Sequence, residues 1–140
     1  TGQSVDKYLQ GQLWPIMESE SYFYRHANQS NIMVGGSFAA SLRDYGRIGL
    51  LALNNGMANR KSVLPKSWID SATHSQSLAP QQAGSDDDYH SKLGYGYGWW
   101  IMKGKAGDAF LGLGIYGQII YVNPKRNLVI VQSSAQAEPH

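Results

Sequence analysis

Cysteine is absent from the sequence, which excludes disulfides, thiolate metal ligands and a cysteine nucleophile. Charge is sparse as well: 16% of the 140 residues are charged, and the net charge of +2 is not gathered into a basic stripe, so nucleic-acid binding is not expected. Apolar runs are too short to span a membrane. The four histidines lack the spacing of a metal-binding pair, so no metal is expected.

What the chain does have is 42% hydrophobic residues, enough for the core of one domain or of part of one. The first residues, TGQSVDKYLQ, resemble the middle of a protein, because no initiator methionine or leader precedes them. We therefore expect the chain to be a piece of a longer protein.

The first half of the chain has the patterns of helices. Apolar residues at helical spacing within 5–17 predict a helix whose regular part ends at Pro15, and the capping-box spacing of Ser41 and Asp44 predicts the start of a second one. Pro65 suits the first turn of a short third helix, which we expect to point Trp68 and Ile69 inward.

The second half has the patterns of strands. Alternating apolar residues predict three strands, Tyr95–Met102, Ala109–Val122 and Asn127–Ser134, and short connections at 103–108 and 123–126 would join them into an antiparallel meander. The fold class is therefore α+β. The chain divides into a helical part at 1–75, a polar loop at 76–92 and strands at 93–135.

Three short matches to catalytic patterns are set aside. Ser4 and Lys7 match S-x-x-K, but Ser4 is better explained as a helix N-cap. Tyr121 and Asn123 match Y-x-N on a predicted strand, and the loose K-x-G match at 105–107 lies in a predicted hairpin turn. Such short patterns arise by chance in most chains of this length.

The stretch FLGLGIYGQIIYVNP, residues 110–124, raises a question of its own. It has the apolar content of a strand, yet it carries Gly112, Gly114 and Gly117. Glycine weakens a strand, so a run of glycines marks a bulge, a bend, or a place where a ligand or another backbone approaches closely.

The order of segments resembles a known family. TGQSVDKYLQGQLWPIM, GGSFAASLRDYGRIGLLALNNG, VLPKSWIDSAT, YGYGWWI and FLGLGIYGQIIYVNPKRNLVIVQSSA resemble the C-terminal part of the serine β-lactamase and penicillin-binding-protein superfamily, in the branch of aminohexanoate-dimer hydrolases and related esterases. The resemblance implies an antiparallel sheet flanked by helices. It also implies a serine hydrolase that cleaves an amide or ester bond of a small molecule through an acyl-enzyme.

The resemblance further implies which residues form the site. Gly112-Leu113-Gly114 would replace the family's K-[TS]-G strand, so that the backbone N–H of Ile115 is an oxyanion-hole donor and Gly114 leaves room for the substrate. Tyr116, Gln118 and Gly36 would line the substrate site. Asp44 is interpreted as a cap and Arg43 as a surface or packing residue.

Other features of the family are expected to lie outside this sequence. The serine and lysine of S-x-x-K and the assisting tyrosine stand upstream of the matched segments, so the chain alone should be inactive and should pack with the N-terminal half of its protein, or with a second copy. No cofactor is implied. The compartment is open, with the periplasm or secretion slightly favoured.

Two alternatives accompany this interpretation. In the first alternative, the glycine-rich stretch is a bulged edge strand that binds no substrate. In the second, the whole protein is a non-catalytic binding or regulatory relative of the family. Gly112 replaces the lysine that would bind a carboxylate, which favours an ester or amide hydrolase over a β-lactamase or D,D-peptidase.

Overall fold

The computed structural model describes residues 2–20, 22–24, 38–74, 77–78, 93–102 and 109–135, with 22–24 and 77–78 described by their backbone. The helices in these residues are α1 (Val5–Gln12), α2 (Leu42–Leu53) and α3 (Lys66–Thr73), followed by a short 3₁₀ helix, η1 (Pro124–Arg126). The strands outside the main sheet form two small hairpins, β1 (Tyr22–Tyr24) with β2 (Phe38–Ala40) and β3 (Met57–Ala58) with β4 (Lys61–Ser62). The α+β class is confirmed.

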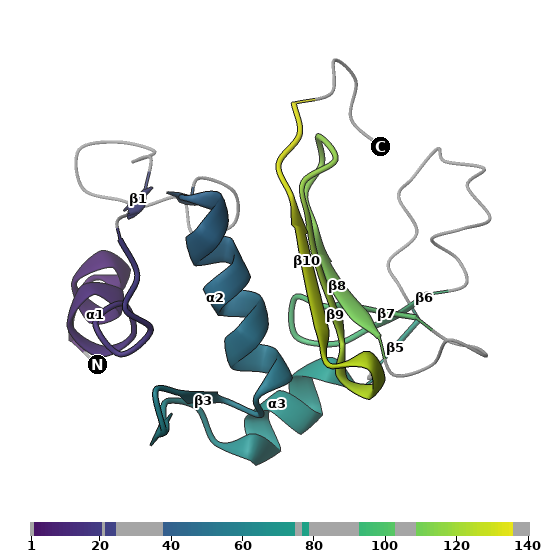
Figure 1. Cartoon of the computed structure of the whole chain (residues 1–140), viewed down its shortest axis with the longest axis horizontal. Coiled ribbons are helices and arrows are strands. Elements are labelled where there is room, and N and C mark those ends of the chain that lie inside the picture. Colours follow the sequence, from purple (N-terminus) through teal and green to yellow (C-terminus); the bar gives the residue numbers. More distant parts are fainter. Residues whose placement is uncertain are drawn as a thin grey trace.

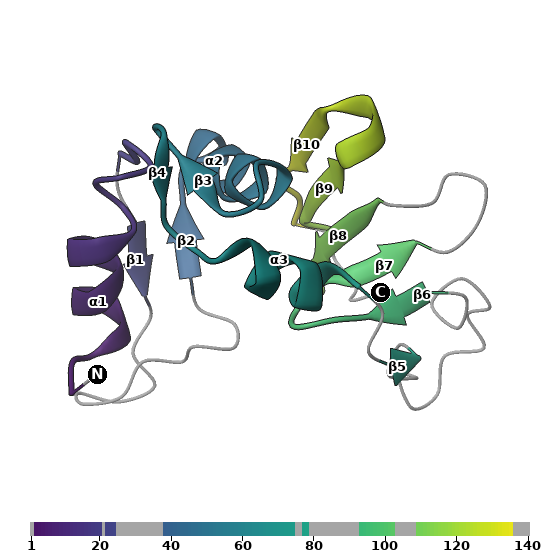
Figure 2. The same cartoon turned by 90° about the horizontal axis from the view of Figure 1, so that it is seen from below.

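The main sheet is antiparallel and has six strands in the order β10-β9-β8-β7-β6-β5. Figure 2 shows them laid out in this sequence. Their bounds are Ser77–Leu78 for β5, Leu93–Tyr95 for β6, Trp100–Met102 for β7, Phe110–Leu113 for β8, Ile119–Asn123 for β9 and Leu128–Gln132 for β10. β5 falls inside the predicted loop at 76–92, most of which lies outside the described residues.

The predicted three-stranded meander is wrong in its strand count. The segment predicted as one strand at 95–102 contains the end of β6, a turn and the whole of β7, which form a hairpin, and the segment predicted at 109–122 is a second hairpin, β8 with β9. Gly98 (φ +84°) and Gly117 (φ +81°) adopt the left-handed conformation that turns the chain back. The predicted connection at 123–126 is confirmed as η1, whereas that at 103–108 lies outside the described residues.

Helix α2 covers one face of the sheet (Figure 1). It runs antiparallel to β10 and packs Ala52 into a core with Ile101, Phe110 and Val122, of which Val122 is completely buried. The approach is close at Gly49, where a Cβ atom would lie 2.6 Å from Val129 Cγ1. The helix therefore sits on the sheet with no room for a side chain at this position.

The other side of α2 forms a second core, which lies away from the sheet. Trp14, Met17 and Leu51 are buried there, and Phe38 meets Trp14 edge to face at 5.4 Å. The Tyr45 hydroxyl donates to the Phe38 carbonyl oxygen (2.8 Å). Burial raises the pKa of Tyr45, so the phenol stays a donor at neutral pH.

Asp44 ties the segment after α1 to the start of α2. Its carboxylate is completely buried and accepts from the Glu20 backbone N–H (3.1 and 3.2 Å), the Ser41 hydroxyl (2.9 Å) and Arg47 (2.6 Å). The Asp44 N–H donates in turn to Ser41 Oγ, so Ser41 is the N-cap as predicted. Asp44 does more than cap, because it also binds a backbone group 24 residues away.

The other two helices each differ from the sequence prediction in one respect. The first helix ends at Gln12, before the predicted end at Pro15. In α3, Ile69 is buried as predicted, but Trp68 is 51% exposed and stacks on Tyr97 at the surface, with ring centroids 5.2 Å apart. None of the helices in the described part of the chain is both long and apolar enough to cross a membrane.

The contact at Gly49 predicts opposite effects for two alanine substitutions on α2. Gly49→Ala should destabilise the protein by about 1 kcal/mol, because overpacking against Val129 outweighs the gain in helix propensity. Gly46→Ala should stabilise it by up to about 1 kcal/mol, because its Cβ would lie 3.8 Å from Val131 Cγ2. Urea unfolding of both variants measures this, and equal effects would contradict the close approach.

The Asp44 cluster predicts a larger loss. Asp44→Ala should lower the free energy of unfolding by about 3 kcal/mol, because Arg47 and the Glu20 N–H lose a buried acceptor. Glu20→Gln is the matched control. It removes an exposed ion pair with Arg43 and should cost less than about 1 kcal/mol in the same urea titration. A small loss for Asp44→Ala would show that the cluster is dispensable.

Candidate active site

The candidate site is the turn between β8 and β9, the light green loop at the upper end of the sheet in Figure 1. The Gly114 N–H donates to the Gln118 carbonyl oxygen (2.8 Å), and the Gly117 N–H donates to the Gly114 carbonyl oxygen (3.0 Å). The two central residues, Ile115 and Tyr116, do not have positive φ, and Gly117 follows them in the left-handed conformation. This is a turn of type I closed by a glycine bulge.

The turn leaves one backbone donor without an acceptor. The Tyr116 N–H donates to Gln118 Oε1 (3.2 Å), so the N–H groups of Gly114, Tyr116 and Gly117 are all engaged. Ile115 lies between them, is 56% exposed, and its N–H has no acceptor within the described residues. An N–H that has no acceptor among the described residues and is held in a closed turn is able to bind an anionic oxygen.

The strand leading into this turn has an open edge. β8 pairs with β7 only at Leu111 and Phe110, whereas Gly112 and Leu113 pair with β9 alone in the described part of the chain. The first half of β8 has a neighbour on both sides, whereas the alternative of a bulged edge strand without a substrate concerns residues 112–117 and stays open. The second half presents free backbone groups on the side that leads to Ile115.

The surroundings of Gly112 and Gly114 differ in the space they leave for a side chain. A Cβ on Gly114 would lie 2.5 Å from Gln118 Oε1, so Gly114 is needed first of all because the Gln118 side chain lies across it. A Cβ on Gly112 would lie 3.9 Å from both Trp99 and Ile120, which is ordinary contact. Gly112 therefore has room for a side chain that the sequence does not supply.

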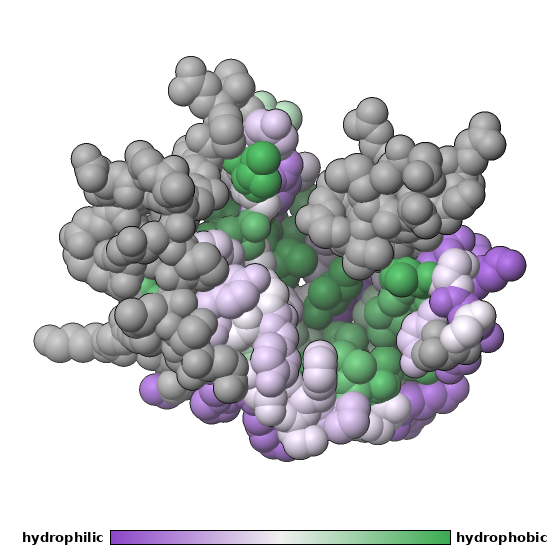
Figure 3. All heavy atoms as spheres, turned by 180° about the vertical axis from the view of Figure 1, so that it is seen from behind, coloured by the Kyte–Doolittle hydropathy of each residue, from purple (hydrophilic) through white to green (hydrophobic). Residues whose placement is uncertain are grey.

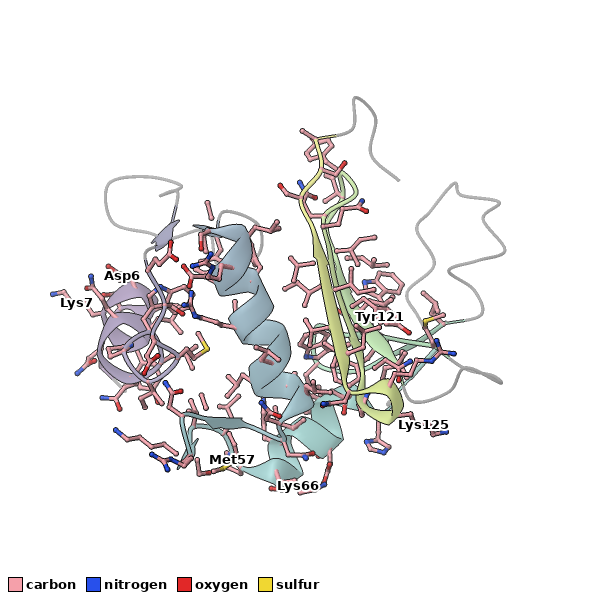
Figure 4. All side chains as sticks on the ribbon, in the orientation of Figure 1. Asp6, Lys7, Met57, Lys66, Tyr121 and Lys125 are labelled. Atoms are coloured by element: carbon pink, nitrogen blue, oxygen red, sulfur yellow. The ribbon has the colours of Figure 1, made fainter. Side chains whose placement is uncertain are left out.

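The rejected motifs lie away from the turn. Lys7 and Ser4 are on or next to α1, which lies on the far side of α2 from the sheet, and Lys7 points away from the molecule (Figure 4). Ser4 occupies the N-cap position without a side-chain cap bond. Tyr121 projects from the sheet face opposite α2, where its hydroxyl accepts from Asn123 Nδ2 (3.0 Å).

The aromatic residues near the turn lie in different places. Tyr116 is at the tip of the turn and 44% exposed, so its ring is accessible. Trp99 packs on Phe110 on the α2 face, and Trp100 packs on Tyr95 on the opposite face. Gly36 and the K-x-G match at 105–107 lie outside the described residues, so the structure does not place them.

One residue of the site was missed from the sequence. Gln132, the last residue of β10, donates from Nε2 to the Gly117 carbonyl oxygen (3.0 Å). It is 15 positions from Gly117, and no spacing rule connects the two. The register of β9 with β10, which pairs Gln132 with Ile119, brings them together.

Apolar surface is left uncovered on this chain. On the sheet face opposite α2, Leu93 and Leu111 are buried but Ile130 is 52% exposed. Seen from behind, the molecule is hollowed near its centre, and hydrophobic residues line the hollow (Figure 3). Groups of histidine and carboxylate side chains able to hold a metal are absent from the described residues.

Comparison with known proteins places this arrangement in a family. A family model described as Beta-lactamase matches residues 1–140. The chain is 25% identical, over 99% of its length, to a 6-aminohexanoate-dimer hydrolase of Paenarthrobacter ureafaciens, of which it covers 36%. A Bacillus anthracis structure provisionally named a 6-aminohexanoate-dimer hydrolase has a TM-score of 0.83 and 31% identity over the whole chain, which covers 35% of that structure.

A more distant structure shares the fold. A penicillin-binding protein homologue from Caulobacter crescentus has a TM-score of 0.72 at 11% identity, with 96% of this chain and 47% of that one aligned. The chain thus spans about a third of the length of the hydrolases it matches most fully. Since the family model matches it from end to end, the chain belongs to the β-lactamase family, within the superfamily of serine β-lactamases and penicillin-binding proteins, and corresponds to a C-terminal part of that fold.

Proposed function

We propose that this chain is the C-terminal segment of a serine hydrolase that cleaves amide or ester bonds through an acyl-enzyme, and that the Ile115 N–H is one of its oxyanion-hole donors. The observation that carries the proposal is the turn at 114–117. Three hydrogen bonds engage the N–H groups of this turn other than that of Ile115. Family membership supports the reaction class, because the relatives named above are hydrolases.

The open end of β8 supports the same role. The backbone groups of Leu113 face the edge away from β9 and have no strand partner there within the described residues, so an extended acyl group can lie along this strand with its carbonyl oxygen at the turn. Donors at about 2.7–3.1 Å from the developing oxyanion stabilise the tetrahedral intermediate. Tyr116 and Gln118, at the tip and base of the turn, and Gly36 are the proposed substrate contacts.

Gly112 bears on the class of substrate. The position has space for a side chain but offers no cation, so a carboxylate on the substrate would find no partner there. We therefore propose a small-molecule amide or ester without a carboxylate at this position.

The nucleophile and base come from outside this chain in the proposal. Ser4 and Lys7 lie across α2 from the turn, and Tyr121 is on the opposite face of the sheet. A hydrolase of this type that lacks nucleophile and base keeps only binding and part of the oxyanion hole, so the chain alone should be inactive. The N-terminal part of the protein would also cover apolar surface that this chain leaves exposed.

Labelling of the full-length protein with a fluorophosphonate tests the reaction class. We expect one probe mass per molecule, on a serine outside this chain, and turnover of an aryl ester. The isolated chain is the matched control and should gain no mass. A full-length protein that takes no label and cleaves no ester or amide would instead be a non-catalytic binding or regulatory relative.

Replacement of Ile115 tests the oxyanion role. Ile115→Pro removes only the N–H, because proline is favoured at the second position of a type I turn, and should lower kcat/KM by about 10²–10³-fold. Ile115→Ala keeps the N–H and should retain most of the activity. Equal losses in the two variants would show that the side chain matters and the N–H does not.

A further inference from the structure

We propose that Gln118 and Gln132 are positioning residues that brace the turn at 114–117 so that the Ile115 N–H is its single free donor. This inference rests on the proposed function. It gives Gln118 a task at the site besides substrate contact, and it gives a task to Gln132, which no sequence pattern indicated.

Gln118 acts from the base of the turn. Its Oε1 atom accepts from the Tyr116 N–H (3.2 Å), and its side chain lies across Gly114 so closely that a Cβ there would be 2.5 Å from Oε1 and 3.1 Å from the Gln118 Cβ. Without this acceptor, two neighbouring N–H groups would compete for the substrate oxygen. Gln118 thus leaves one donor free and holds the peptide next to it.

Gln132 acts from the neighbouring strand. Its Nε2 atom donates to the Gly117 carbonyl oxygen (3.0 Å) in a partly buried bond that spans 15 positions of the chain. Gly117 is the left-handed residue that closes the turn, so this bond fixes the peptide on which the turn pivots. Gln132 thus couples the turn to β10, the strand that packs on α2 through its other face.

The two glutamines therefore hold the turn from opposite sides. Gln118 engages the N–H that follows Ile115, and Gln132 engages the carbonyl of the residue that ends the turn. Donors fixed before the reaction cost no reorganisation when charge develops, which is the condition for an effective oxyanion hole. A turn without these braces would keep the donor but lose its orientation.

The test is a double-mutant cycle in the full-length protein. Gln118→Met and Gln132→Met should each lower kcat about three- to tenfold, the loss expected for one hydrogen bond that acts in the transition state. KM should stay unchanged in Gln132→Met and should rise in Gln118→Met, which also loses the proposed substrate contact. Either change should add no further loss to Ile115→Pro, because the donor it positions is gone. Gln12→Met, an exposed glutamine on α1, is the matched control and should change neither constant.

Hydrogen exchange rates of the turn amides, measured by NMR, test the bracing role without an activity assay. The Tyr116 amide should exchange faster in Gln118→Met than in the unaltered protein, and Gln118→Glu, which keeps an acceptor oxygen, should restore its protection. This readout separates a local brace from a general loss of stability, because the amides of β9 should be unaffected.

The outcomes distinguish the two proposals. If Gln118→Met lowers kcat by the same factor with and without Ile115→Pro, Gln118 acts independently of that donor and the bracing role is wrong. If Ile115→Pro leaves kcat unchanged, the oxyanion role is wrong. Amide exchange then decides the brace by itself, and unchanged exchange at Tyr116 in Gln118→Met would overturn it.

Discussion

The close contact between α2 and the sheet is the constraint on which the rest of the structure depends. It is made at Gly49, where the helix backbone approaches Val129 and Ile120 too closely for a side chain. Because β10 is held there, its register with β9 is fixed, and a one-residue slip would turn Val129 and Val131 out of the core. The same register carries Gln132 to the turn that follows β8.

Helix α2 also joins the two cores. One of its faces packs on Val122 and Phe110, and the other packs on Trp14 and Met17. The buried carboxylate of Asp44 fixes the start of the helix by binding groups from the segment after α1. Since α2 runs antiparallel to β10, its fixed N-terminal end lies at the same end of the sheet as the turn.

In the proposed role, the apolar hairpin would serve the reaction without a reactive side chain. Its contribution is a backbone N–H whose neighbours are all engaged, so a single peptide group is left to meet an oxygen. Gly112 has no side chain, so this position of the strand next to the turn offers no cation to a substrate. The chain would thus form one wall of a site, and the reacting groups would come from the rest of the protein.

The sequence by itself determined the family, the α+β class and the N-cap of α2 at Ser41, and it singled out the glycine-rich stretch. These features are local or are carried by the order of segments, so a linear pattern is sufficient to reveal them. It also directed attention to Ile115 by resemblance, and the free N–H of that residue agrees with the role proposed for it.

Only the tertiary structure decided that the stretch is a hairpin and not one strand, because a period of two continues through a tight turn and only the left-handed Gly117 interrupts it. The outward position of Trp68 depends on Tyr97, and the bond of Gln132 to Gly117 depends on strand register. These contacts join residues far apart in sequence, and the free energy that selects them comes from packing the whole sheet on α2, which no local pattern contains.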